Sequence, residues 1–97
     1  MIGPGSKELL FLAGLALDSE LIANTPCWVS YIPQAIFLGK KIIYIHNSYE
    51  NKWRLDPCEL DKVLTENKND KAKVIILTYP DNPTGLSYTG KELKLIA

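Results

Sequence analysis

A rigid turn near the end of the sequence could hold one polar side chain in place for a ligand. Residues 79–85 read Tyr-Pro-Asp-Asn-Pro-Thr-Gly. The prolines fix φ and remove backbone donors, and Gly85 allows a tight exit, so the amide of Asn82 is held steady. The apolar run at 74–77 precedes the turn, and ligands of parallel α/β sheets bind at the carboxyl ends of strands. An ordinary turn is the alternative, because Pro, Asn and Gly clusters are common in turns.

A second stretch, Gly3–Lys7, reads Gly-Pro-Gly-Ser-Lys and stands before an apolar helical segment. Its small residues let the backbone approach a ligand, and the free N–H groups and dipole of a helix N-terminus favour a phosphate. Ser6 adds a hydroxyl donor. The stretch has neither the Walker spacing nor the three-glycine Rossmann spacing. A plain helix start is therefore the alternative to a phosphate site.

A third stretch, Pro26–Tyr31, reads Pro-Cys-Trp-Val-Ser-Tyr and follows a short apolar segment. The ring of Trp28 could cover a flat ligand at the same edge of the sheet, and the alternative is a packing tryptophan. Trp53 lies in a polar connection and is interpreted as a packing anchor, and the isolated His46 as a structural or surface residue. A planar aromatic cofactor with a phosphate and a ring hydroxyl would use the loop, the ring of Trp28 and the amide of the turn together.

Helices and strands alternate in the pattern that must position these groups. Helices are predicted over 8–17, 30–38, from Asp56 onward, and from a capping box at 89–92. Strands are predicted over 21–24, 41–46 and 74–79, with a charged loop at 65–73. The first helix is apolar almost all round, so burial on more than one side is expected.

The alternation predicts right-handed βαβ units in an α/β fold of three layers, with a mostly parallel sheet and helices on both faces. Residues 1–97 are interpreted as a single partial domain. The chain starts at a loop that looks functional and stops inside an apolar helix, and we expect it to be part of a larger domain.

Composition excludes several classes of protein. Hydrophobic residues make up 46% and charged residues 23% of the chain, which is typical of globular domains. Lys plus Arg and Asp plus Glu both number 11, so no broad field attracts nucleic acid or an anionic membrane. No apolar run could span a bilayer, and the start lacks signal-peptide features. Cys27 and Cys58 lack metal-site spacing, which favours reduced thiols, no metal and a cytoplasmic location.

The order of the three stretches resembles the class I and II aminotransferases, which are pyridoxal 5'-phosphate (PLP) enzymes of fold type I. The resemblance rests on Gly-Ser-Lys at 5–7, Pro-Cys-Trp-Val-Ser-Tyr at 26–31 and Pro-Asp-Asn-Pro-Thr-Gly at 80–85. Gly-Lys at 39–40 and Leu-Asp-Pro at 55–57 agree with it. It covers essentially the whole chain and is closest to the aspartate-aminotransferase-like group. The Asn-Pro-Thr-Gly motif is its most specific part.

By this resemblance, five residues would bind the cofactor. Backbone N–H groups of Gly5, Ser6 and Lys7, with the Ser6 hydroxyl, would hold its phosphate. Trp28 would stack on the pyridine ring, and Asn82 would donate a hydrogen bond to the ring 3-oxygen. The peptide bonds before Pro26 and Pro83 are candidates for the cis form.

The resemblance also implies an activity, which is transfer of an amino group between an amino acid and a 2-oxo acid. It implies a homodimer or a self-associating chain. The family's Schiff-base lysine, its aspartate on the pyridine nitrogen and its substrate-binding arginine would lie beyond Ala97, so no catalytic residue is assigned. Another fold type I PLP enzyme, such as a lyase or a decarboxylase, and a non-catalytic truncated remnant are the alternatives.

We therefore expect that the 97-residue chain alone does not catalyse transamination, because no lysine in it can be assigned the Schiff-base role. The check is an assay of amino-group transfer from amino acids to 2-oxo acids by the purified chain. Turnover with contaminating host enzyme excluded would contradict this expectation.

Overall fold

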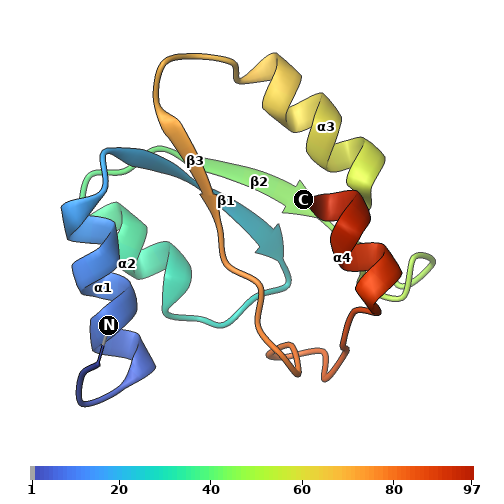
Figure 1. Ribbon diagram of the computed structural model, residues 1–97, viewed down its shortest axis with the longest axis horizontal. Coiled ribbons are helices and arrows are strands. Elements are labelled where there is room, and N and C mark those ends of the chain that lie inside the picture. The colour runs from blue at the N-terminus through green and yellow to red at the C-terminus, as the bar shows by residue number, and fades with distance from the viewer. Residues whose placement is uncertain (1) are drawn as a thin grey trace.

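The computed structural model describes residues 2–97, in which helices and strands alternate (Figure 1). The elements in chain order are α1 (Ser6–Ala16), β1 (Ser19–Thr25), α2 (Tyr31–Phe37), β2 (Ile42–His46), α3 (Pro57–Glu66), β3 (Ala72–Ile75) and α4 (Gly90–Ile96). The order of helices and strands is the one that the sequence predicts.

The three strands form one parallel sheet in the order β2-β1-β3, with β1 in the centre. Leu21 of β1 is level with Ile42 of β2, and the next residue, Ile22, pairs with both Ile43 and Ile75. Because side chains alternate along a strand, Leu21 and Ile22 point to opposite faces of the sheet. The central strand therefore supplies a core residue to each face.

Helices cover both faces, which confirms the predicted three-layer α/β fold (Figure 1). Helices α1 and α2 pack on the face that carries Leu21, and α3 and α4 pack on the face that carries Ile22. The chain crosses from β1 to β2 and then back past β1 to β3. The crossover through α2 and the crossover through α3 have the same hand but run in opposite directions along the sheet. The two helices therefore lie on opposite faces.

The helix ends follow the predicted local signals. The Asp56 carboxylate accepts a hydrogen bond of 2.8 Å from the backbone N–H of Cys58 at the start of α3. Thr89 and Glu92 form a complete capping box at the start of α4. Gly39 follows α2 with φ of 64°, which is the left-handed conformation that glycine adopts most readily.

Helix α1 differs from the prediction of burial on more than one side. None of its residues is fully buried, and Leu15 is 65% exposed. Phe11 packs against Phe37 of α2 with their ring centroids 5.9 Å apart. Helix α1 is covered by α2 and the sheet on one side only, because no other element within residues 2–97 packs on its outer side. The prediction is wrong for this reason.

The third strand also differs from its predicted bounds of 74–79. Strand β3 begins earlier, at Ala72, and ends at Ile75, while α3 extends to Glu66 into the predicted charged loop. Beyond Ile75 the chain no longer pairs with β1. The apolar run at 74–77 continues into this segment, so hydrophobicity alone does not mark where the pairing stops.

A buried ionic cluster lies at the amino edge of the sheet. The side chain of Glu20 is 6% exposed, and its Oε2 atom lies 3.2 Å from Nζ of Lys73 and 3.9 Å from Nζ of Lys41. The side-chain amide of Asn69 donates a hydrogen bond of 2.9 Å to Oε1. Burial opposes the ionisation of Glu20. The hydrogen bond from Asn69 and the contacts with Lys73 and Lys41 outweigh this effect, so the pKa of the Glu20 carboxyl lies below the ordinary 4.5.

This lowered pKa predicts that the chain loses stability in acid. A group that is more acidic in the folded state stabilises the fold above its unfolded pKa of 4.5, and the contribution is lost as pH falls through the folded value. Glu20→Gln should therefore lower the free energy of unfolding at neutral pH, and its difference from the parent should narrow in acid. Urea unfolding across this range measures both effects.

Glu59→Gln is the matched control, because the Glu59 side chain is 56% exposed and lies 3.9 Å from the exposed Lys62. It should change stability little. If the free energy of unfolding of the parent chain and of Glu20→Gln differed by the same amount at every pH, this result would contradict the role assigned to the buried carboxylate.

Candidate functional site

A cleft at the carboxyl edge of the sheet brings together three of the residues singled out by the sequence. Ser6 from the start of α1, Trp28 from the β1–α2 loop and Asn82 from the turn after β3 all line it. Tyr31 and Thr78 line the same cleft. Parallel pairing aligns the carboxyl ends of the strands, so loops far apart in sequence meet at this edge.

The start of α1 forms one wall of the cleft and has no side-chain cap. Its N-cap residue is Gly5, whereas Asp56 and Thr89 cap α3 and α4. The first N–H groups of α1 therefore lack partners within the helix. Gly5 has an extended backbone with φ of 174°, and a Cβ added there would meet no atom within 4 Å. Its local fold thus does not require glycine, and the space beside its backbone is open.

Trp28 stands beside this helix start. Nζ of Lys7 lies 5.8 Å from the centroid of the Trp28 ring. The side-chain amide of Gln34 in α2 donates a hydrogen bond of 2.9 Å to the backbone carbonyl of Lys7. The first turn of α1 is thereby tied to the helix that follows Trp28, and the peptide bond before Pro26 is cis.

The turn that carries Asn82 is closed by hydrogen bonds to Asp81. The backbone N–H of Asp81 donates to Leu86 O over 2.7 Å, and the N–H of Gly85 donates to Asp81 O over 2.8 Å. The Thr84 hydroxyl donates to the Asp81 carboxylate over 2.6 Å. Gly85 has φ of 71°, a left-handed conformation that favours glycine.

The side chain of Asn82 is exposed and forms no hydrogen bond with any other residue in the range 2–97. The predicted turn is present, but within residues 2–97 no hydrogen bond holds the side chain of Asn82 itself. The peptide bonds Tyr79-Pro80 and Asn82-Pro83 are both cis. The turn holds the backbone of Asn82 while leaving its amide available to a ligand.

The segment just before α3 and the first turn of α4 hold the far side of the turn. Nη1 of Arg54 donates to Glu92 Oε1 over 2.7 Å and to Ser87 O over 3.2 Å. The hydroxyl of Tyr88 accepts a hydrogen bond of 2.9 Å from the backbone N–H of Leu55. These contacts fix the segment between the turn and α4 against the start of α3.

Cys27 lies near the turn as well. Burial, together with the charge of Asp81, raises the pKa of the Cys27 thiol above 9.0. Cys27 and Cys58 are both free thiols. A raised pKa keeps the Cys27 thiol protonated and poorly nucleophilic near neutral pH.

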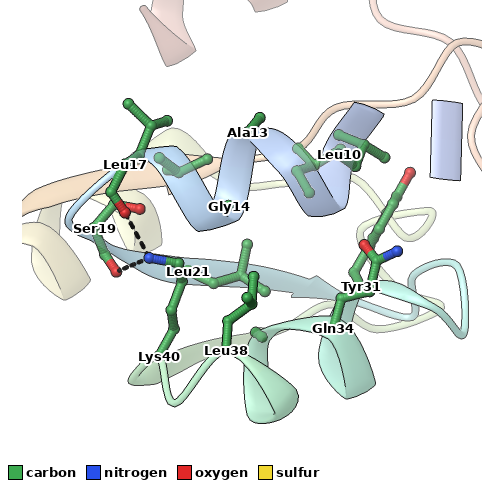
Figure 2. A pocket seen from close by; sticks show the side chains of 13 residues that line it. Leu10, Ala13, Gly14, Leu17, Ser19, Leu21, Tyr31, Gln34, Leu38 and Lys40 are labelled. Atoms are coloured by element: carbon green, nitrogen blue, oxygen red, sulfur yellow. Dashed lines mark hydrogen bonds between the residues drawn. The ribbon is translucent and has the colours of Figure 1, made fainter. Parts of the chain in front are cut away.

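An inner apolar cavity of about 80 Å³ lies between α1, α2 and the sheet. Figure 2 shows Tyr31 and Gln34 at one end of it and Lys40 at the other. The Lys40 ammonium donates to the backbone carbonyl of Leu17 over 2.6 Å (Figure 2). Leu10, Tyr31 and Ile76 line both this cavity and the cleft, so they separate the two.

Sequence reasoning missed the pair formed by Tyr31 and Thr78. Their hydroxyl oxygens are 2.6 Å apart and share a hydrogen bond between residues 47 positions apart. The signals available were a tyrosine within the Pro26–Tyr31 stretch and a polar residue just after the apolar run. Neither signal shows that the two side chains meet.

Other predicted positions fall outside the cleft, and Gly5 and Lys7 are among them, because they line a separate groove at the start of α1. His46 is exposed, and its Nδ1 lies 2.9 Å from the Thr25 hydroxyl, in agreement with a structural or surface role. Trp53, interpreted from the sequence as a packing anchor, is 38% exposed and lines a surface groove. Residues 2–97 contain no helix long and apolar enough to cross a membrane, and no cluster of three potential metal ligands.

These features define a three-layer α/β protein with a polar and aromatic cleft at the carboxyl edge of its sheet. Comparison with known proteins gives the same family throughout. The family model "Aminotransferase class I and II" matches residues 1–97. The aspartate aminotransferase of Bacillus subtilis is 38% identical over 95% of this chain and 23% of its own length. The asparagine–oxo-acid transaminase of Streptococcus mutans is 35% identical over 99% of the chain and 24% of its own length.

A solved structure agrees with these sequence relatives. The crystal structure of the aspartate aminotransferase from Rhizobium meliloti superposes with a TM-score of 0.80 at 25% identity, over 95% of this chain and 23% of that one. The chain belongs to the class I and II aminotransferases. It spans about a quarter of the length of the relatives it matches.

The hydrogen bond between Thr84 and Asp81 predicts a specific effect of Thr84→Val, which keeps the side-chain shape but removes the hydroxyl. A hydrogen bond to a charged group contributes roughly 1.5 kcal/mol or more. The variant should therefore open the turn more often and raise the amide exchange rate of Gly85 about tenfold. Hydrogen exchange followed by NMR measures this rate.

Thr65→Val is the matched control, since Thr65 is an exposed residue of α3. It should leave the exchange of Gly85 unchanged. An unchanged Gly85 rate in Thr84→Val would show that the hydroxyl does not hold the turn.

Proposed function

We propose that residues 1–97 form a single partial domain that binds PLP in an aminotransferase. In the whole protein, this domain would bind the cofactor that is needed to transfer an amino group between an amino acid and a 2-oxo acid. The observation that carries the proposal is that Ser6, Trp28 and Asn82 line one cleft. Membership of the aminotransferase family supports it. We also propose a cytoplasmic location, because both cysteines are free thiols and thiols stay reduced in the cytoplasm.

The start of α1 suits the phosphate of PLP. The N–H groups around Gly5, Ser6 and Lys7 would donate to phosphate oxygens, together with the Ser6 hydroxyl. Two observations support this assignment. The helix has no side-chain cap that would compete for these donors, and the space beside the backbone of Gly5 is open. A positive helix end also favours the charge of the phosphate.

Trp28 and Asn82 suit the ring of the cofactor. Trp28 would stack on the pyridine, and the amide of Asn82 would donate a hydrogen bond to the ring 3-oxygen. Such a bond stabilises the ionised form of that oxygen. The Asn82 amide forms no hydrogen bond with another residue in the range 2–97, so it can donate without breaking an existing contact. When bound, PLP supplies an electron sink for chemistry at the substrate amino group.

We also propose that the protein works as a homodimer. The outer faces of α1 and α2 carry exposed apolar side chains, among them Leu15, Ile36 and Phe37, which are 65%, 64% and 80% exposed. Large apolar side chains exposed on neighbouring helices are often found at protein interfaces. The names of the relatives differ in the amino acid they specify, so the proposal extends only to amino acids and 2-oxo acids as a class.

The proposed contacts can be tested with pyridoxine 5'-phosphate, which carries the ring, the hydroxyl and the phosphate but no aldehyde that would react with surface lysines. Its binding should quench the fluorescence of Trp28, measured in a Trp53→Phe background. Asn82→Ala should weaken binding about tenfold, as expected for a hydrogen bond to a charged oxygen. Gly5→Ala should weaken binding without loss of stability, because its methyl group would project into open space next to the N–H groups proposed to hold the phosphate.

Gly90→Ala is the control for the glycine substitution, since a Cβ at the exposed first residue of α4 also meets no atom within 4 Å. It should bind pyridoxine 5'-phosphate like the parent chain. Equal affinities for the parent, Asn82→Ala and Gly5→Ala would contradict the proposed assignment.

A further inference from the structure

Tyr31 is the buried residue that stands between the cleft and the inner cavity. It is the first residue of α2 and is 9% exposed. Its ring lines both spaces, and only Leu10 and Ile76 do the same among residues 2–97. Figure 2 shows its side chain at the end of the inner cavity nearest Gln34. Tyr31 is therefore part of the wall behind the cleft.

Tyr31 also contacts Trp28 in two ways. Its backbone N–H donates a hydrogen bond of 3.2 Å to the carbonyl of Trp28. The two rings meet edge to face, with centroids 5.5 Å apart and an interplanar angle of 81°. This arrangement is a favourable geometry for aromatic pairs. The plane of the Trp28 ring is thus set against a side chain that is itself buried.

The hydroxyl of Tyr31 extends this contact to the other side of the cleft. It shares the 2.6 Å hydrogen bond with Thr78, which lies four residues before Asn82. The bond links the loop of Trp28 to the segment that enters the turn of Asn82. A buried hydroxyl left without a partner is costly, so the pair favours one fixed spacing between these two segments.

We propose that Tyr31 is a positioning residue that holds the Trp28 ring in the orientation needed to stack on the cofactor. The inference rests on the proposed function, because Trp28 is assigned to the cofactor there. Tyr31 acts through Trp28 and Thr78 and need not touch the ligand. The competing possibility is that Tyr31 only fills the core, in which case its hydroxyl does not affect the Trp28 ring.

The test uses the full chain in a Trp53→Phe background labelled with 5-fluorotryptophan, so that Trp28 gives the single ¹⁹F NMR signal. Tyr31→Phe removes the hydroxyl and keeps the ring. Thr78→Val breaks the same hydrogen bond from the other side, and Thr78→Ser retains it. Tyr49→Phe is the matched control, because Tyr49 is 78% exposed.

Without ligand, Tyr31→Phe and Thr78→Val should broaden or split the Trp28 signal, while Thr78→Ser and Tyr49→Phe should leave it sharp. With pyridoxine 5'-phosphate, the first two variants should bind about three- to tenfold more weakly, as expected for one buried hydrogen bond. A sharp, unshifted signal in both Tyr31→Phe and Thr78→Val would overturn the proposal, whatever their melting temperatures.

The ligand-free spectra and the binding measurements together separate this inference from the proposed function. If the parent chain binds no pyridoxine 5'-phosphate, the proposed function fails at this domain, but the ligand-free spectra still test the role of Tyr31. If the parent binds and the Trp28 signal is unchanged in both variants, the positioning role fails while the proposed function stands.

Discussion

The fold depends on the parallel pairing of β1 with a strand on each side. Consecutive residues of β1 point to opposite faces, so Leu21 anchors the α1 and α2 layer while Ile22 anchors the α3 and α4 layer. Both hydrophobic clusters therefore include a residue of the same strand, β1. The same pairing aligns the carboxyl ends of the strands, which is what brings loops from three parts of the chain to one edge. Packing and site geometry have a common origin in this strand.

The site combines rigid backbone with side chains that have no internal partner. Asp81 organises its turn through both backbone groups and its carboxylate, while the neighbouring amide of Asn82 makes no such contact within residues 2–97. Helices α1 and α2 likewise begin without a side-chain cap, whereas α3 and α4 have one. Polar groups that have no partner within the protein can bind a ligand without first breaking an internal interaction.

Much of this arrangement could be predicted from local signals. Asp56-Pro57, the capping box at Thr89, Gly39 and the Asn82 turn depend on residues close in sequence, and the structure has each of them. Three features could not be predicted. The exposure of Leu15 depends on which neighbours cover α1, and the end of β3 at Ile75 depends on where its pairing with β1 stops. The hydrogen bond between Tyr31 and Thr78 depends on the meeting of two distant segments. Hydrophobic periodicity reports burial, but it does not identify the partner.

The turn of Asn82 is attached to a different layer at each end. Before the turn, Thr78 is bonded to Tyr31 in the α1 and α2 layer. After it, Tyr88 is bonded to Leu55 in the α3 and α4 layer. The segment 78–88, which contains the turn, therefore has a side-chain hydrogen bond to each of the two layers. The position of the Asn82 backbone therefore depends on the spacing of the two layers, and a core substitution that alters this spacing would move Asn82 without contacting it.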